Sequence, residues 1–140
     1  MSVRKKIGLL VGSTYGFICR VPLVGEPAVR GFCRALGFLG NRVAGGMKWK
    51  GSMDELKQDL EDVFGQLDID FEAMNHDEES IELILSSCPY GFRRPEHAQA
   101  CDAAMDLDRT LFGYCGCDLT IEACLPHGDP VCRVIIRKKD

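Results

Sequence analysis

The chain has 140 residues, of which 46% are apolar, 27% charged and 8% aromatic, and its formal net charge is −4. These values fit one globular domain and exclude the collagenous, coiled-coil and intrinsically disordered classes. The negative charge argues against a general nucleic-acid binder. The unusual feature is the presence of eight cysteines in a chain of this length.

Eight cysteines in a short chain indicate either a disulfide framework or a set of metal-binding thiols, and the compartment decides between them. The N-terminus carries Arg4, Lys5 and Lys6 before an apolar run, but glycines interrupt that run and no cleavage pattern follows it. No stretch reaches the ~20 apolar residues that span a bilayer. We therefore expect a cytoplasmic protein with reduced thiols and without a membrane partner.

Charge is distributed unevenly along the chain. Residues 1–50 carry nine Lys or Arg and one acid, whereas residues 54–82 carry twelve acids and one Lys. This polarity favours a partner of complementary charge, or head-to-tail association of identical subunits into a homo-oligomer. The alternative is that the two segments form two solvated faces of one domain.

The first predicted element is a helix. Residues 3–25 are Gly-rich and show no clear periodicity, so they receive no assignment. Pro27 is well placed as the first residue of a helix over 27–44, which the pair Gly45-Gly46 would end. The glycines within this helix predict that it packs closely against a neighbour.

A second helix and a hairpin follow. Ser52 and Glu55 form a capping box ahead of an apolar stripe that runs to Leu67, which predicts a helix. Alternating apolar residues then predict a β-hairpin of strands 68–74 and 79–87, joined by an Asn-His-Asp turn.

The last third of the chain predicts another helix and another hairpin. Pro95 begins a helix that extends to about Phe112. Apolar alternation over 119–124 and 132–137, around a Pro-His-Gly-Asp-Pro turn, predicts the final hairpin. The fold class is therefore α+β, with an antiparallel sheet of about four strands in two hairpins and about three helices.

We expect the whole chain, residues 1–140, to form this single domain. Residues 50–140 would be its core, and residues 1–48 an N-terminal segment of unassigned role.

The final hairpin supplies a geometric argument for a metal site. If its turn is centred on Gly128, Cys124 and Cys132 face each other across the ladder, with Cβ atoms about 4.5–5.5 Å apart. Two such thiolates can ligate one metal, or form a disulfide under oxidising conditions. Cys88 lies just past a predicted strand and Cys101 lies in the second turn of the next helix, so four sulfurs can meet at the rim of the sheet.

A site made of Cys88, Cys101, Cys124 and Cys132 would hold either zinc or an iron–sulfur cluster. The spacing C-x12-C-x22-C-x7-C lacks the C-x2-C pairs that are common in structural zinc sites.

Four further cysteines and one histidine lie outside this predicted ligand set. Cys115 and Cys117 are alternative ligands, a second metal site, a redox dithiol, or incidental small residues. We expect Cys19 and Cys33 to be inert buried thiols. His127 at the hairpin tip is expected to be an exposed turn residue.

Residues 88–134 resemble the C-terminal half of the 4-vinyl-reductase-like superfamily. That group includes the L-2-amino-thiazoline-4-carboxylic acid hydrolases and the ligand-sensing domains of bacterial phenol-responsive activators. The matching features are Cys88-Pro89, Cys101 at a helix start, Cys124, Gly128-Asp129 and Cys132.

The resemblance implies an α+β fold, a metal site built from those cysteines, and a pocket for a small apolar or aromatic ligand. In the phenol sensors a glutamate is among the zinc ligands, but Ile121 occupies the matching position here. The resemblance therefore implies an all-sulfur site in this chain.

We expect a four-cysteine metalloprotein, with a four-iron, four-sulfur cluster favoured over Zn²⁺. Its role would be redox, electron transfer or small-ligand sensing, with a redox partner protein or a small apolar or aromatic ligand. Such a ligand would occupy a pocket lined by Phe32, Phe71, Leu83 and Met105. The alternatives are a metal-dependent hydrolase of a cyclic C–N bond, resembling the thiazoline-carboxylate hydrolases, and a structural zinc domain.

Overall fold

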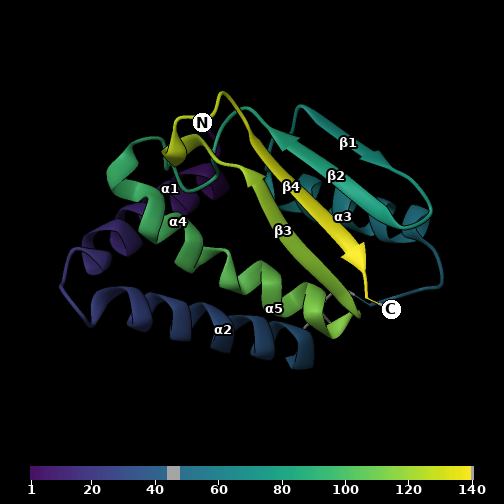
Figure 1. Cartoon of the computed structure of the whole chain (residues 1–140), viewed down its shortest axis with the longest axis horizontal. Helices are drawn as coiled ribbons and strands as arrows, with labels where there is room; N and C mark the ends of the chain where they lie inside the picture. Colours follow the sequence, from purple (N-terminus) through teal and green to yellow (C-terminus); the bar gives the residue numbers. More distant parts are fainter. Residues whose placement is uncertain (44–47, 140) are drawn as a thin grey trace.

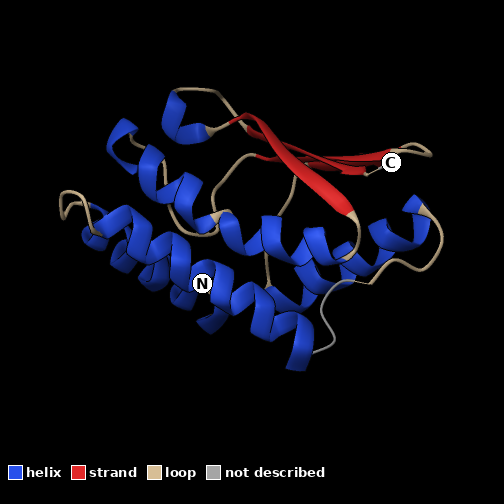
Figure 2. Cartoon of the chain, turned by 60° about the horizontal axis from the view of Figure 1, so that its bottom comes forward, coloured by secondary structure: helices blue, strands red, loops and turns tan. Residues whose placement is uncertain are grey.

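The computed structural model describes residues 1–43 and 48–139 (Figure 1). The predicted α+β class is confirmed, because a four-stranded antiparallel sheet in the order β1-β2-β4-β3 is covered by helices on one face (Figure 2). Among the described helices, none is both long enough and apolar enough to cross a membrane.

The helices and strands follow the predicted order with one addition at the N-terminus. They are α1 (Val3–Cys19), α2 (Gly25–Val43), α3 (Met53–Leu67), β1 (Ala73–His76), β2 (Ser80–Leu85), α4 (Ala98–Ala104), α5 (Asp106–Tyr114), β3 (Cys117–Ala123) and β4 (Cys132–Lys138). The helix predicted from Pro95 is interrupted, since a 3-10 turn over Pro95–His97 precedes α4, and Met105 separates α4 from α5.

The Gly-rich start of the chain forms α1. Ser2 caps this helix by accepting a hydrogen bond from the Lys5 N–H. A Cβ at Gly12 would collide with the Tyr90 carbonyl oxygen, and one at Gly8 would lie 2.7 Å from that of Pro89. The glycines therefore let α1 approach the loop after β2 more closely than any other residue would allow.

Helix α2 agrees with the predicted helix as far as Val43, and its predicted end at Gly45-Gly46 lies outside the described residues. The expected close packing occurs at Gly37, where a Cβ would lie 2.8 Å from the Thr110 Cβ on α5. It does not occur at Gly31, where a Cβ would have no neighbour within 4 Å among the described residues.

One ionic cluster joins α2 to α5. Asp106 is buried, with 4% of its surface exposed. Its carboxylate accepts hydrogen bonds from Arg30 at 2.9 Å, Arg34 at 2.8 Å and Arg109 at 2.8 Å. Three guanidinium groups compensate the burial of this charge.

The first hairpin differs from its prediction at both the strand start and the turn. Strand β1 begins at Ala73 instead of residue 68 and turns Met74 inward, while Phe71 is 38% exposed and packs on Phe64 outside the strand. The turn follows His76, because the Asp77 carboxylate accepts hydrogen bonds from two backbone N–H groups, of Glu79 and Ser80.

Part of the charge polarity is satisfied within the chain. Lys5 pairs with Asp70 at 2.8 Å, and Lys50 pairs with Asp59 at 3.0 Å. The basic segment 1–50 and the acidic segment 54–82 therefore contact each other at these two positions.

Candidate metal and ligand site

The site begins at a β-bulge in the final hairpin. Ile121 pairs with Val134, and the next pair along the ladder is Ala123 with Arg133. The register therefore shifts by one residue at Glu122. Cys124 lies beyond the end of β3, and Cys132 pairs with Leu85 of β2. The predicted Cys124–Cys132 pair is therefore not part of the ladder.

The two cysteines are nevertheless close to each other. A 3-10 turn over Leu125–His127 replaces the simple predicted turn, and Gly128 closes it with φ of 93°, a left-handed conformation that glycine adopts readily. The Asp129 carboxylate accepts a hydrogen bond from the Cys124 N–H at 2.9 Å. The Cys132 sulfur accepts one from the Leu125 N–H at 3.4 Å.

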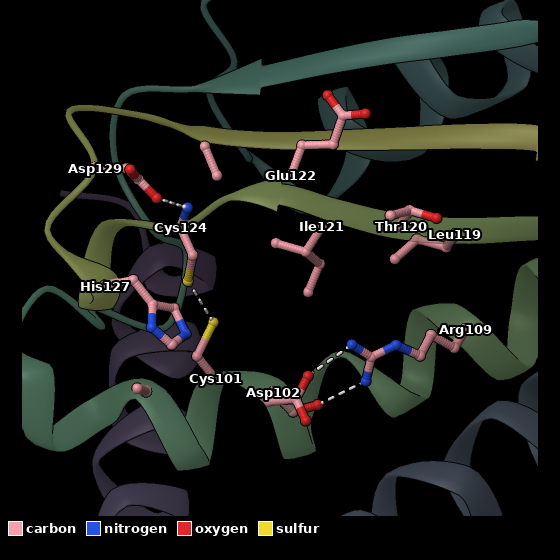
Figure 3. Close-up of a pocket in the computed structure, with 12 residues that line it drawn as sticks. Cys101, Asp102, Arg109, Leu119, Thr120, Ile121, Glu122, Cys124, His127 and Asp129 are labelled. Atoms are coloured by element: carbon pink, nitrogen blue, oxygen red, sulfur yellow. Dashed lines mark hydrogen bonds and ion pairs between the residues drawn. The ribbon is translucent and has the colours of Figure 1, made fainter.

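A direct sulfur–sulfur contact joins the hairpin to helix α4. The Cys101 and Cys124 Sγ atoms lie 3.4 Å apart and point toward each other (Figure 3). Both residues are buried, at 9% and 5% exposure. Cys101 reaches this position from the buried face of α4, which also carries Ala100, Ala103 and Ala104.

All four predicted ligands line one apolar cavity of about 250 Å³ between the sheet and helices α3 to α5. Two of the predicted apolar lining residues, Leu83 and Met105, lie in its wall. Phe32 and Phe71 do not, and they are 55% and 38% exposed. Residues of α3, α4 and α5 form the helical wall of the cavity. Phe32 packs against Tyr15 instead, and Phe71 packs against Phe64.

The arrangement of the thiols is not that of an assembled metal shell. Within residues 1–43 and 48–139, no group of three or more His, Cys, Asp or Glu side chains is close enough to hold a metal ion. Burial raises the pKa values of Cys88, Cys101 and Cys124, so these thiols are protonated at neutral pH. A metal would have to displace those protons and draw Cys88 and Cys132 toward the Cys101–Cys124 pair.

A polar groove of about 450 Å³ lies on the other side of the same sulfur pair. Figure 3 shows His127 beside the two sulfurs and the Asp102–Arg109 ion pair, at 2.7 Å, farther along the groove. Cys101 and Cys124 line both the groove and the apolar cavity. The sulfur pair therefore stands in the wall between a polar and an apolar compartment.

The four remaining cysteines do not line the cavity. Cys115 and Cys117 are buried in the packed core beside α5, and neither lines the cavity. Cys33 is completely buried, as predicted, whereas Cys19 is half-buried instead of buried; both belong to the apolar cluster around Tyr15. His127 is exposed, as predicted.

Asp108 also lines the cavity, although the sequence favours a solvated or helix-capping role for this carboxylate over a functional one. Burial raises the pKa of this carboxyl to about 6. Its position carried a signal, because Cys101, Met105, Asp108 and Phe112 are spaced as one face of a helix. A charged residue in an otherwise apolar stripe marks a candidate functional group.

Comparison with known proteins adds no assignment. No protein-family model matches the chain and no curated protein matches its sequence, so the resemblance of residues 88–134 to the 4-vinyl-reductase-like superfamily stays a prediction.

Proposed function

We propose that this domain binds a thiophilic metal centre through Cys88, Cys101, Cys124 and Cys132, and a small apolar molecule in the adjoining cavity. The observation that carries the proposal is that four cysteines, spread over 45 residues of sequence, all line one apolar cavity. We place the protein in a reducing compartment such as the cytoplasm, where free thiols persist.

The distance between Cys101 and Cys124 bears on the kind of metal centre. Two thiolates that each lie ~2.3 Å from one tetrahedral ion are about 3.8 Å apart. The observed sulfur separation of 3.4 Å is close to that value. In a four-iron cluster each iron takes one cysteine and the thiolates stand farther apart. The spacing favours zinc, or one iron of a two-iron cluster, over the four-iron cluster that the sequence favours.

A metal bound by these residues would cross-link α4, the β3–β4 hairpin and the loop after β2, and an iron centre would add a redox couple. Four thiolates leave no open position for a water molecule. The donor set therefore supports a structural, redox or sensing role better than hydrolysis of a cyclic C–N bond.

The cavity is large enough for a small ligand. An engineered apolar cavity of about 150 Å³ binds benzene, and this one measures about 250 Å³. Because Cys88, Cys101, Cys124 and Cys132 form part of its wall, a ligand there contacts the thiols directly. Occupancy of the cavity and of the metal site would then be coupled, as a sensor requires.

Anaerobic purification followed by elemental analysis and visible absorption tests the metal half of this proposal. We expect about one bound metal centre per chain, colourless if it is zinc and brown if it contains iron and sulfide. Chain purified after growth with added zinc and iron that still contains neither metal would contradict the proposal. Titration with 2-phenylethanol, followed by thermal shift, tests the cavity separately.

A further inference from the structure

The apolar cavity contains one charged side chain. Among its described lining residues, Asp108 is the only Asp, Glu, Lys, Arg or His. The remainder of the wall consists of aliphatic and aromatic side chains, the four thiols, Ser87 and Tyr90. Asp108 lies in the first turn of α5 and keeps part of its surface accessible.

Asp108 differs sharply from Asp106, its neighbour in the same turn. The Asp106 carboxylate receives hydrogen bonds from three arginines. In the described part of the chain, no other side chain donates a hydrogen bond to the Asp108 carboxylate or lies within ion-pair distance of it, and its own backbone N–H and the charge of Arg109 are what favour its ionised form. A carboxylate in a largely apolar wall with so few partners is a candidate binding group.

We infer that Asp108 makes this cavity selective for small apolar amines, molecules with an aromatic or aliphatic body and one protonated amino group. The ammonium would donate a charge-assisted hydrogen bond to the carboxylate, which is strong because the surroundings are apolar. The inference rests on the ligand cavity of the proposed function and names its ligand class.

The same geometry disfavours the other classes of small apolar ligand. A neutral hydrocarbon would exclude water from the carboxylate and offer it no hydrogen-bond donor, and a carboxylic acid would bring a second negative charge beside it. A site that holds an unpaired polar group discriminates strongly against analogues that cannot bond to it.

The test uses three ligands of matched shape: 2-phenylethylamine, 2-phenylethanol and 3-phenylpropionate. Isothermal titration calorimetry of the intact metal-loaded chain at pH 7.5 keeps Asp108 ionised, since its pKa is about 6. We expect the amine to bind at least about ten-fold more tightly than the alcohol, as a hydrogen bond to a charged group implies. The carboxylate should bind more weakly than both.

Two variants locate the effect. Asp108→Asn should abolish the preference for the amine, while the alcohol should still bind. The control Glu122→Gln removes an exposed carboxylate from the polar groove, not from the cavity, and should leave the preference intact.

The outcomes separate this inference from the proposed function. Equal affinities of wild type for amine and alcohol, or loss of the preference in Glu122→Gln, would overturn the role of Asp108 and leave the cavity in place. Failure of all three ligands to bind would overturn the inference together with the ligand half of the proposed function. The metal content, measured on the same samples, stands apart from both.

Discussion

Two pairs of buried cysteines in this molecule have very different surroundings. Cys115 and Cys117 form a C-x-C motif, but their sulfurs only approach backbone carbonyls, of Leu111 at 3.8 Å and of Cys115 at 3.9 Å, within the packed core. Cys101 and Cys124 are separated by 23 positions in the sequence, yet their sulfurs touch beside a cavity. Proximity in sequence is therefore a poor guide to which thiols can act together.

The strongest test of this difference is removal of one sulfur from each pair. Cys124→Ser should reduce the bound metal to less than about a tenth of the wild-type content and lower the melting temperature, because metal affinity contributes directly to folding free energy. Elemental analysis and thermal unfolding measure both effects. Full metal content in Cys124→Ser would contradict the proposal that Cys124 is a metal ligand.

A second test concerns the cavity beside the Cys101–Cys124 pair, and it uses Asp108, which lines the same cavity. The Asp108 pKa of about 6 lies above the unfolded value of 3.8, so the folded state binds more protons between these pH values. Its stabilising contribution is complete below pH 3.8 and is lost as pH rises through 6.

Asp108→Asn should therefore stabilise the protein at pH 7.5, by at most about 3 kcal/mol and by less where water reaches the carboxyl. Urea unfolding at pH 7.5 and pH 4 measures this difference, which should shrink at the lower pH. A variant that is no more stable than wild type at pH 7.5 would show that Asp108 is well solvated. Glu122→Gln is the matched control.

The packed pair should respond to substitution through stability alone. Cys117→Ser places a hydroxyl where a sulfur is 1% exposed in the core. We expect a loss of about 1–3 kcal/mol, the cost of a poorly satisfied buried polar group, with unchanged metal content. Loss of metal in this variant would make Cys115 and Cys117 ligands and reverse the comparison.

The test with the smallest expected effect uses chemical oxidation of the thiols instead of a substitution. Treatment of metal-free protein with the thiol oxidant diamide should cross-link Cys101 to Cys124, whose sulfurs already lie 3.4 Å apart. Peptide mapping should find that disulfide and none between Cys115 and Cys117. Prior loading with zinc should slow the reaction, because the thiolates would be engaged. A disulfide confined to Cys115 and Cys117 would contradict the structure.

The elements that the sequence predicts well are those with a local pattern. The stripe from Met53 to Leu67 and the alternation in β2 define which face is buried without knowledge of the neighbours. Helix α1 has no such pattern, since Val3, Ile7, Leu10 and Phe17 remain exposed. Its glycines are explained only by the approach to the loop at Tyr90, a long-range contact.

The candidate site, like the fold, could be predicted from the sequence only where local patterns determine it. Cys88, Cys101, Cys124 and Cys132 were placed near one rim of the sheet by element boundaries alone. The bulge at Glu122 and the direct contact of Cys101 with Cys124 depend on backbone detail and on the packing of α4 that no spacing rule contains. The sequence favours a solvated role for Asp108 because an acidic residue on a helix is most often solvated.

The arginines around Asp106 affect how the domain unfolds. Arg30 and Arg34 come from α2, so separation of the N-terminal helices from α5 would break two of the three arginine contacts of Asp106. It would also expose the apolar surface packed between the two helices to water, which disfavours the separation. The N-terminal helices should therefore unfold in one transition with the sheet, and a protein truncated before residue 50 should be cleaved rapidly by proteases instead of persisting as a trimmed domain.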